Sequence, residues 1–322
     1  MSLDDIFQDY LVNQTTVDSL AHGIVLEDRS SSWIYKKRSS EMNSELSVDS
    51  PFQIGSLSKL LTACVVLQLC KLGFLDLYSL YPISASDQSI CFTLDELLRH
   101  RSGILGPQGY LGFRLGEDSQ QSFPELEVEI RENFNGNYKT RYHYSGINYR
   151  AIQFILESQL GQTYRDLLKI HLCEPLGLFN TSSSFADFNQ LHLVKGFDQH
   201  QTMIPDGWHS FVGIEAAAGI WSSLFDLSKL MSELLLHKEG SVTMDGFHVS
   251  WRDLINTHCA EPYRYGCFVS KSSSLIKIGH SGRNPGFQSL FWFTPALRKG
   301  VITLWNTDQF DKQIASISLK LL

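Results

Sequence analysis

The sequence predicts an α+β fold: an antiparallel sheet flanked by terminal helices, with a helical lobe inserted between the strands. Strand-like runs separated by glycine and proline lie near both ends of the chain, in residues 21–35 and 274–307. Helical patterns fill the middle of the chain and also occur at residues 3–13 and 311–322. One sheet built from both chain ends accommodates all three observations.

Local signals define the first elements after the N-terminal helix. Residues 21–26 and 33–35 have the composition of strands, and the sequence EDRSSS between them predicts a hairpin turn. Residues 57–72 form one of the most apolar runs of the chain and stop at Gly73, which predicts a buried helix.

Capping signals place further helices in the middle of the chain. Thr93 and Glu96 have the spacing of a capping box, which starts a short helix that ends near His100. Ser223 and Asp226 have the same spacing and open a helix through about residue 236. The other helices are expected at residues 148–160 and 164–171, whereas residues 103–140 look rich in loops and turns, with an acidic amphipathic piece at 125–132.

The period of the pattern changes near the C-terminus. The runs SLIKIGHSG, GFQSLFWFTP and GVITLWNT read as adjacent antiparallel strands. We therefore expect a single unit over residues 1–322. It would consist of an α/β lobe (about 1–75 and 212–322) and an inserted helical lobe (about 76–211). The ligand cleft is expected where the two lobes meet.

Composition and charge exclude several classes of function. The chain has 322 residues, of which 43% are hydrophobic, enough for a large core. Its net charge of −7 and the lack of a long basic cluster argue against a nucleic-acid partner. The longest apolar run, residues 60–67, is too short for a membrane span. The acidic N-terminus lacks the features of a signal peptide, so we expect a cytoplasmic protein as sequenced, or a periplasmic or extracellular one if a leader was removed.

Cysteines and histidines give no sign of a metal site. None of the six cysteines belongs to a CxxC pair, and most lie in apolar segments, where they act as small buried hydrophobes. The eleven histidines are scattered, without HxH or HExxH spacing. We expect no metal and no cofactor.

The first chemical signal is the sequence Ser56-Leu-Ser-Lys59. At the first turn of a helix, residues three apart share a face, so the serine oxygen and the lysine amine can touch. A serine hydroxyl needs a base, and burial lets a lysine serve as one by lowering its pKa. The alternative is a lysine that only reaches solvent from a helix start. A second match, Ser274 to Lys277, lies in a strand-like run, where this spacing points the side chains to opposite faces.

Two further segments carry polar groups at the ends of elements. Tyr144 stands before the predicted helix at 148–160, where a phenol can relay protons. The alternative is that Tyr144 packs against its helix. His280, Ser281 and Gly282 end a strand, and the glycine would let a substrate chain approach the strand edge. A histidine there also has an ordinary structural reading.

Together these segments resemble the serine hydrolases related to β-lactamases: class C β-lactamases, D-alanyl-D-alanine carboxypeptidases, and esterases. The resemblance covers nearly the whole chain in collinear order. It rests on the segments PFQIGSLSKLLTA, LDELLRHRSGI, YRDLLKIHLCEPLGLFNTS, EAAAGIWSSLFDLSKLM, YRYGCFV, GHSGRNPGF and GVITLWNT.

The resemblance implies a role for each matched position. Ser56 would be the acylated nucleophile, Lys59 its activating partner, and Tyr144 the first residue of the family's Tyr-x-Asn element. His280, Ser281 and Gly282 would stand where many relatives carry Lys-Thr-Gly. The backbone N–H groups of Ser56 and Arg283 would form the oxyanion hole. The side chain of Arg283 could supply a charge for a substrate carboxylate.

Two positions depart from the family pattern. Gly146 replaces the asparagine of Tyr-x-Asn, and Asn148, two residues on, is expected to point elsewhere on the helix. His280 replaces the lysine of Lys-Thr-Gly and is largely neutral at pH 7. Both changes weaken the grip on an anionic amide such as a penicillin.

The leading hypothesis is a serine hydrolase of the β-lactamase or D-alanyl-D-alanine carboxypeptidase type, which acts through an acyl-enzyme on Ser56. Its partner would be a small molecule or peptide with a reactive carbonyl. One alternative is an esterase or acyltransferase on the same fold. The other, motivated by Gly146, is a non-catalytic sensor or binding protein.

Overall fold

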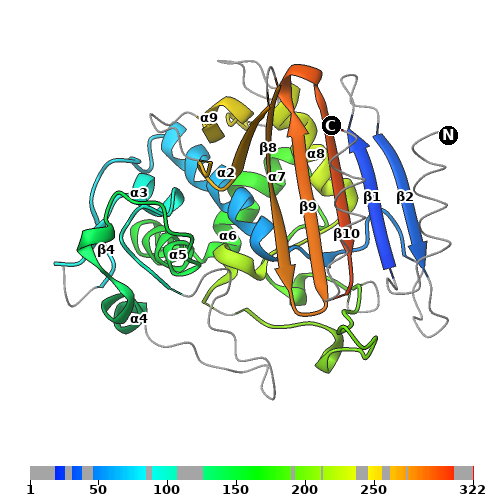
Figure 1. The fold of residues 1–322 in the computed structure, drawn as a ribbon, viewed down its shortest axis with the longest axis horizontal. Helices are drawn as coiled ribbons and strands as arrows, with labels where there is room; N and C mark the ends of the chain where they lie inside the picture. The colour runs from blue at the N-terminus through cyan, green and yellow to red at the C-terminus, as the bar shows by residue number, and fades with distance from the viewer. Residues whose placement is uncertain are drawn as a thin grey trace.

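The computed structural model has an α+β fold built on a six-stranded antiparallel sheet with the strand order β2-β1-β10-β9-β8-β7 (Figure 1). It describes residues 19–25, 31–37, 46–84, 89–106, 126–189, 193–211, 213–236, 246–255, 262–272, 275–307 and 322. The strands of this sheet are β1 (Ser19–Val25), β2 (Ser31–Lys37), β7 (Phe268–Ser272), β8 (Leu275–Asn284), β9 (Phe287–Thr294) and β10 (Lys299–Trp305).

Two short strand pairs and a set of helices complete the described part. The pairs are β3 (Phe52–Gln53) with β6 (Trp221–Ser222), and β4 (Tyr81–Pro82) with β5 (Cys91–Phe92). The α-helices are α2 (Ser58–Lys71), α3 (Leu94–Leu98), α4 (Leu126–Asn133), α5 (Ile147–Leu160), α6 (Tyr164–Leu168), α7 (Glu174–Leu176), α8 (Leu224–Leu236) and α9 (Trp251–Ile255).

The large sheet joins the two ends of the chain, as the sequence predicts. β1 pairs with β10, with Leu20 opposite Trp305 and Val25 opposite Gly300. The three predicted C-terminal strands are present as β8, β9 and β10, each antiparallel to the next. The helices predicted at 3–13 and 311–322 and most of the turn at 27–32 lie outside the described residues.

The main predicted helices are confirmed, with one correction. The capping box of α3 is complete: Glu96 N donates to Thr93 Oγ1 and Thr93 N donates to Glu96 Oε2, both across 3.1 Å. The helix predicted at 164–171 ends too early. After α6 the chain continues through a π-helical segment, Lys169–Cys173, and α7, because a left-handed stop first occurs at Gly177 (φ +62°).

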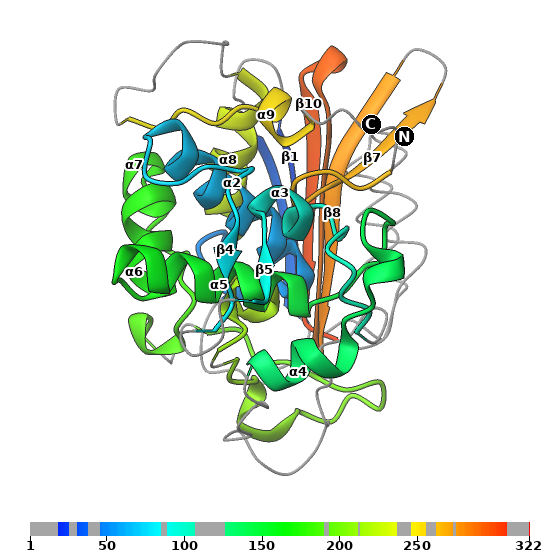
Figure 2. The same ribbon diagram turned by 90° about the vertical axis from the view of Figure 1, so that its left-hand side faces the viewer.

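Helices cover one face of the sheet, which Figure 2 shows nearly edge-on with α2, α5 and α8 to one side. α2 is buried from Ser58 to Leu69, as expected for a helix that is apolar on all sides. α8 packs against β1 and β10, where the missing side chain of Gly300 makes room for Met231. The core thus lies between the sheet and α2 and α8.

The strands of the large sheet all come from chain regions before residue 76 or after residue 211, and α3 to α7 lie between these regions. The proposed lobe boundaries fit this arrangement and stay a prediction.

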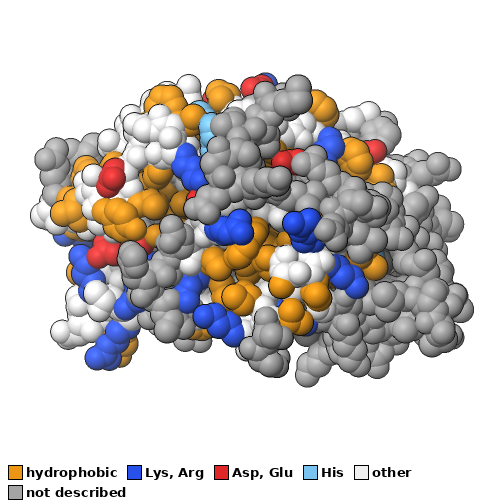
Figure 3. Space-filling model, turned by 90° about the horizontal axis from the view of Figure 1, so that it is seen from above, with side chains coloured by type: hydrophobic (Ala, Val, Ile, Leu, Met, Phe, Trp, Pro, Cys, Tyr) orange, Lys and Arg blue, Asp and Glu red, His pale blue; other side chains and the backbone are white. Residues whose placement is uncertain are grey.

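In the part of the chain that the structure describes, no helix combines the length and apolar character that a membrane crossing needs. Figure 3 shows hydrophobic side chains gathered among lysines and arginines on the face seen from above.

Candidate active site

Ser56 and Lys59 meet at the start of α2. Ser56 lies in a 3-10 turn, Gly55–Leu57, that leads directly into this helix. The Nζ atom of Lys59 is 3.2 Å from Ser56 Oγ. Ser56 is half-buried, whereas Lys59 has an exposed fraction of only 1%. The structure therefore brings together the serine and the lysine that the sequence motif pairs.

The surroundings of Lys59 disfavour its charged form. Burial lowers the pKa of Lys59 from 10.5 to about 7. Its amine donates across 2.8 Å to the carbonyl oxygen of Ala217, which lies in a π-helical turn, Glu215–Gly219. The Nζ atom also lies 5.2 Å from the ring centroid of Tyr144 and 5.6 Å from that of Tyr149. A large fraction of Lys59 is consequently neutral near pH 7 and able to accept a proton.

Tyr144 joins this pair from the segment before α5. Its half-buried side chain lies near that of Ser56. Burial raises the pKa of Tyr144 against a smaller, opposite effect of Ser56, so its hydroxyl stays protonated at neutral pH. Ser56, Lys59 and Tyr144 form one hydrogen-bonded and packed group, which we call the catalytic cluster.

Strand β8 lies against the turn that carries Ser56. A side chain on Gly55 (φ +55°) would meet the backbone N of Arg283 at 2.5 Å, so only glycine allows this approach. A side chain on Gly282 would meet the carbonyl oxygen of Ile54 at 1.8 Å. Ser289 Oγ donates to the same oxygen across 2.7 Å. The backbone of Arg283 is thereby held beside Ser56.

Gly282 also has a packing role that the sequence does not reveal, and its predicted role toward a substrate stays a prediction. The space beside its Cα is taken by the Ile54 carbonyl, so its missing side chain serves the contact with the nucleophile turn. The edge of strand β8 that the prediction needs is present. β7 pairs with β8 only up to Gly279, opposite Phe268, and no described strand pairs with the next residues of β8 on that side.

His280 faces the cluster as a neutral group. It has an exposed fraction of 2%, and its ring centroid lies 6.2 Å from that of Tyr144. Its Nδ1 atom donates to the carbonyl oxygen of Ser281 across 2.5 Å. Burial, followed by the charge of Lys59, lowers the pKa of His280 to about 3. Ser281 and Arg283 are exposed, so their side chains lie on the other face of the strand.

The displaced asparagine does point elsewhere, as expected. Asn148 is fully buried and its Oδ1 atom accepts from Ser102 Oγ across 2.5 Å. Its amide nitrogen lies 3.1 Å from His100 Nδ1. Gly146 adopts an ordinary helical backbone and has no side-chain amide that could face the cluster.

Three residues contribute to the site although no sequence motif assigns them a role: His100, Ala217 and Tyr263. The ring centroid of the fully buried Tyr263 lies 5.8 Å from that of Tyr144 and 5.7 Å from that of His280. The only available signals were the His-x-Ser-Gly turn at His100 and the closing segment around Tyr263, neither of which defines a role.

The remaining polar groups do not extend the site. Lys277, of the second serine–lysine match, lies in strand β8, and Ser274 is outside the described residues. Within the described ranges no group of three or more histidine, cysteine or acidic residues is placed to hold a metal. The cysteines in the described part of the chain form no disulfide bond, and burial raises the pKa of Cys64, Cys173 and Cys267.

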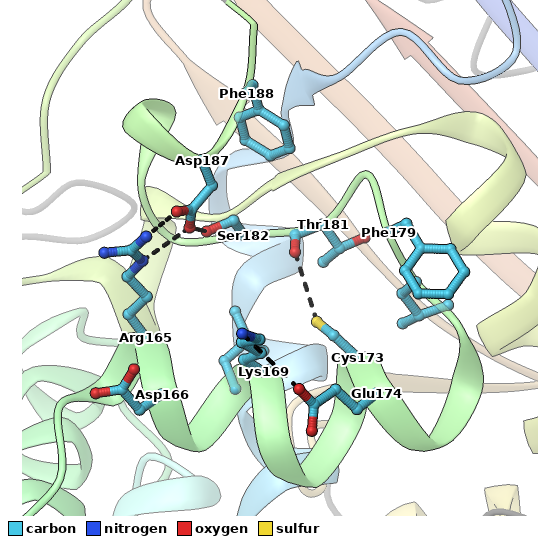
Figure 4. A pocket seen from close by; sticks show the side chains of 12 residues that line it. Arg165, Asp166, Lys169, Cys173, Glu174, Phe179, Thr181, Ser182, Asp187 and Phe188 are labelled. Atoms are coloured by element: carbon cyan, nitrogen blue, oxygen red, sulfur yellow. Dashed lines mark hydrogen bonds and ion pairs between the residues drawn. The ribbon is translucent and has the colours of Figure 1, made fainter.

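A separate pocket of about 420 Å³ lies beside α6 and α7 (Figure 4). Its polar side chains contact one another: Arg165 pairs with Asp187, and Lys169 lies 3.8 Å from Glu174. No member of the catalytic cluster lines this pocket.

Comparisons with known proteins identify the family and the fold of this chain. The family model described as Beta-lactamase matches residues 21–320. The chain belongs to the beta-lactamase family. This membership is consistent with a serine hydrolase. A curated relative of the family, penicillin-binding protein 4 of Amycolatopsis lactamdurans, is 29% identical over 140 residues, which cover 41% of this chain and 36% of that protein.

Two solved structures have the same fold. The beta-lactamase/D-alanine carboxypeptidase from Pseudomonas syringae superposes with a TM-score of 0.79 at 15% identity, covering 100% of this chain and 98% of that one. The D-amino acid amidase from Ochrobactrum anthropi SV3 gives 0.76 at 18% identity, covering 97% and 94%. The chain spans only 36% to 65% of the length of the curated relatives it matches.

Proposed function

We propose that the protein is a serine hydrolase that works through an acyl-enzyme on Ser56. The observation that carries this proposal is the 3.2 Å contact between Ser56 Oγ and a buried Lys59 amine whose pKa is about 7. A neutral amine at this distance can remove the hydroxyl proton as the oxygen attacks.

The reaction would proceed in two balanced halves. Ser56 Oγ forms a bond to the substrate carbonyl carbon while its proton passes to Lys59 Nζ. The N–H groups of Ser56 and Arg283 would hold the oxyanion, which supplies a few kcal/mol of transition-state stabilisation per donor. When the tetrahedral intermediate collapses, the leaving group departs with a proton that Tyr144 relays from Lys59. Water then attacks the acyl carbon and gives a proton to Lys59, the bond from this carbon to Ser56 Oγ breaks, and Oγ takes the proton from Lys59 as the acid leaves.

The substrate would be a small molecule or peptide with a reactive carbonyl, in the manner of a β-lactamase or D-alanyl-D-alanine carboxypeptidase. Two solved relatives named for their activity, a carboxypeptidase and an amidase, support amide substrates. Ester hydrolysis or acyl transfer is a second candidate. It is favoured by Gly146, which offers no amide to hold a substrate, and by a neutral His280 in place of a lysine.

The decisive experiment is intact-mass measurement after incubation with a panel of penicillins and activated esters. The wild-type protein should gain the mass of one acyl group, and Ser56→Ala should gain none. Ser274→Ala, in the second serine–lysine match, is the control and should be acylated like the wild type. Equal labelling of wild type and Ser56→Ala by every probe would refute the proposal.

A non-catalytic sensor on this scaffold predicts a different pattern. Ligands would raise the melting temperature of the protein without turnover and without any added mass. The paired serine and lysine argue against this alternative, because a scaffold without chemistry gains nothing from a lysine buried at a helix start.

A further inference from the structure

The backbone on both sides of Tyr144 is held by one residue, His100. The N–H of His143 donates to the carbonyl oxygen of His100 across 2.9 Å. The N–H of Ser145 donates to the Nδ1 atom of the same residue across 3.3 Å. His100 also packs on the ring of Tyr144, with 4.5 Å between the ring centroids.

The imidazole of His100 is itself fixed in one orientation. The amide nitrogen of Asn148 approaches its Nδ1 atom at 3.1 Å, and Asn148 is anchored in turn by the hydroxyl of Ser102. Since two N–H donors point at Nδ1, this nitrogen acts as an acceptor and the ring proton of the neutral form resides on Nε2. Burial lowers the pKa of His100 well below its usual value, which keeps this neutral form.

The backbone of His100 adds a second, independent sign of function. Its φ of +54° lies in the left-handed region, which is costly for a residue with a side chain. Such conformations persist where the surrounding contacts enforce them, and they concentrate at functional sites. Here the unusual backbone is what directs both the carbonyl and the ring of His100 toward the segment of Tyr144.

We propose that His100 is a positioning residue that keeps the Tyr144 hydroxyl within reach of Ser56. Asn148 holds the imidazole of His100 in place. This is the role that we propose for Asn148, which lies two residues after the position of the family asparagine. The inference rests on the proposed function, in which Tyr144 relays a proton to the leaving group.

The test uses His100→Phe, which keeps a ring against Tyr144 but removes the acceptor, and His100→Asn, which tolerates the left-handed backbone and keeps a short acceptor. For ester hydrolysis we expect His100→Phe to lower kcat at least tenfold with KM within about twofold, and His100→Asn to recover part of the loss. The half-buried His171, away from the cluster, provides the control His171→Asn, which should retain wild-type kinetics.

A series of esters with different leaving groups separates positioning from general damage to the fold. A poor leaving group depends on the proton from Tyr144, so His100→Phe and Tyr144→Phe should both make kcat fall more steeply as the leaving-group pKa rises. The double variant should be no slower than the slower single variant. A uniform loss for all leaving groups, or an additive double variant, would overturn the inference.

Hydrogen exchange provides a readout that needs no activity. The peptide 142–149 should lose protection at the Ser145 amide in His100→Phe and keep it in His171→Asn. If wild-type protein and Ser56→Ala behave alike in the acylation test, the proposed function is refuted. The hydrogen-exchange result still tests whether His100 holds the Tyr144 segment. If acylation requires Ser56 but exchange and kcat are unchanged in His100→Phe, only the role of His100 is refuted.

Discussion

The amine of Lys59 donates to the carbonyl oxygen of Ala217 across 2.8 Å, from the side chain of α2 to the backbone of the turn Glu215–Gly219. A neutral amine has one lone pair, and this bond fixes the orientation of the group that carries it. Because Ser56 Oγ lies 3.2 Å away, the lone pair can accept the serine proton while the amine stays bound to Ala217. In the proposed mechanism, the π-helical turn therefore helps to orient the base.

The activity should depend on a single group with a pKa near 7. Burial lowers the pKa of Lys59 to about 7, and only its neutral form accepts a proton. We expect acylation rates to rise about tenfold per pH unit below pH 6 and to level off above pH 8. His280 has a pKa of about 3 and does not titrate in this range. Acylation rates of wild type and His280→Gln should therefore share one midpoint; a midpoint that moves by a unit or more in the variant would assign the titration to the histidine.

Replacing Lys59 by methionine should remove activity and stabilise the fold. The folded pKa of about 7 lies below the ordinary 10.5, so the unfolded chain binds more protons between these values and stability rises with pH there. Below pH 7, burial of this amine lowers the free energy of unfolding of the wild type by roughly 5 kcal/mol. Lys59→Met recovers this amount but loses the hydrogen bond to Ala217, which contributes about 1–3 kcal/mol. We expect Lys59→Met to gain about 2–4 kcal/mol in the free energy of unfolding at pH 6.

Urea unfolding at pH 6, 8 and 10 measures this effect, and the advantage of Lys59→Met should disappear by pH 10. Lys169→Met, at a side chain that is 67% exposed, is the matched control and should show no such pH dependence. A loss of stability in Lys59→Met at pH 6 would contradict the assigned cost of burial.

The contact between β8 and the nucleophile turn should not tolerate a methyl group. In Gly282→Ala the new Cβ would lie 1.8 Å from the Ile54 oxygen and 2.6 Å from Ser289 Oγ. We expect a loss of about 3 kcal/mol in the free energy of unfolding and at least a hundredfold slower acylation. Gly136→Ala, whose Cβ meets nothing closer than 4.0 Å, should stay within about 0.5 kcal/mol of wild type. Similar behaviour of the two variants would remove the reason for a glycine at position 282.

Restoring the family asparagine should shift the preference of the enzyme toward amides. Gly146 has a helical backbone (φ −65°, ψ −25°) that any residue can adopt. Gly146→Asn should raise the ratio of amide to ester turnover by about tenfold, the worth of one hydrogen bond of about 1.4 kcal/mol. Gly146→Ala provides the added bulk without the amide and should leave the ratio unchanged. The ratio is measured with a matched amide and ester of the same acyl group.

Local patterns predict much of this molecule. The long apolar run that forms α2 and the capping box at Thr93 and Glu96 were sufficient to place their helices, because both depend on neighbours in the chain. The contact between Ser56 and Lys59 follows from helical spacing for the same reason.

Other features depend on contacts between distant segments and carry no local pattern. Gly55 lies against the backbone of Arg283, and Gly282 lies against the backbone of Ile54. Because these contacts join segments that are far apart in the sequence, no local pattern reveals them. The Ala217 carbonyl and the ring of Tyr263 reach the cluster only through the tertiary fold. The helical conformation also continues past His171, where the sequence predicts its end. It stops only at Gly177, six residues later, which is the first residue to adopt a left-handed backbone.

The close backbone contact between Gly55 and Arg283 has a consequence for engineering this scaffold. Under the proposed mechanism, this contact joins the nucleophile to the second oxyanion donor, so residues 54–56 and 282–283 cannot move apart to accept a larger substrate. Selectivity would then be altered on the side of the half-buried Tyr144, which packs on the fully buried ring of Tyr263. A mutant library aimed at new substrates should hold residues 54–56 and 282–283 constant and diversify the aromatic side instead.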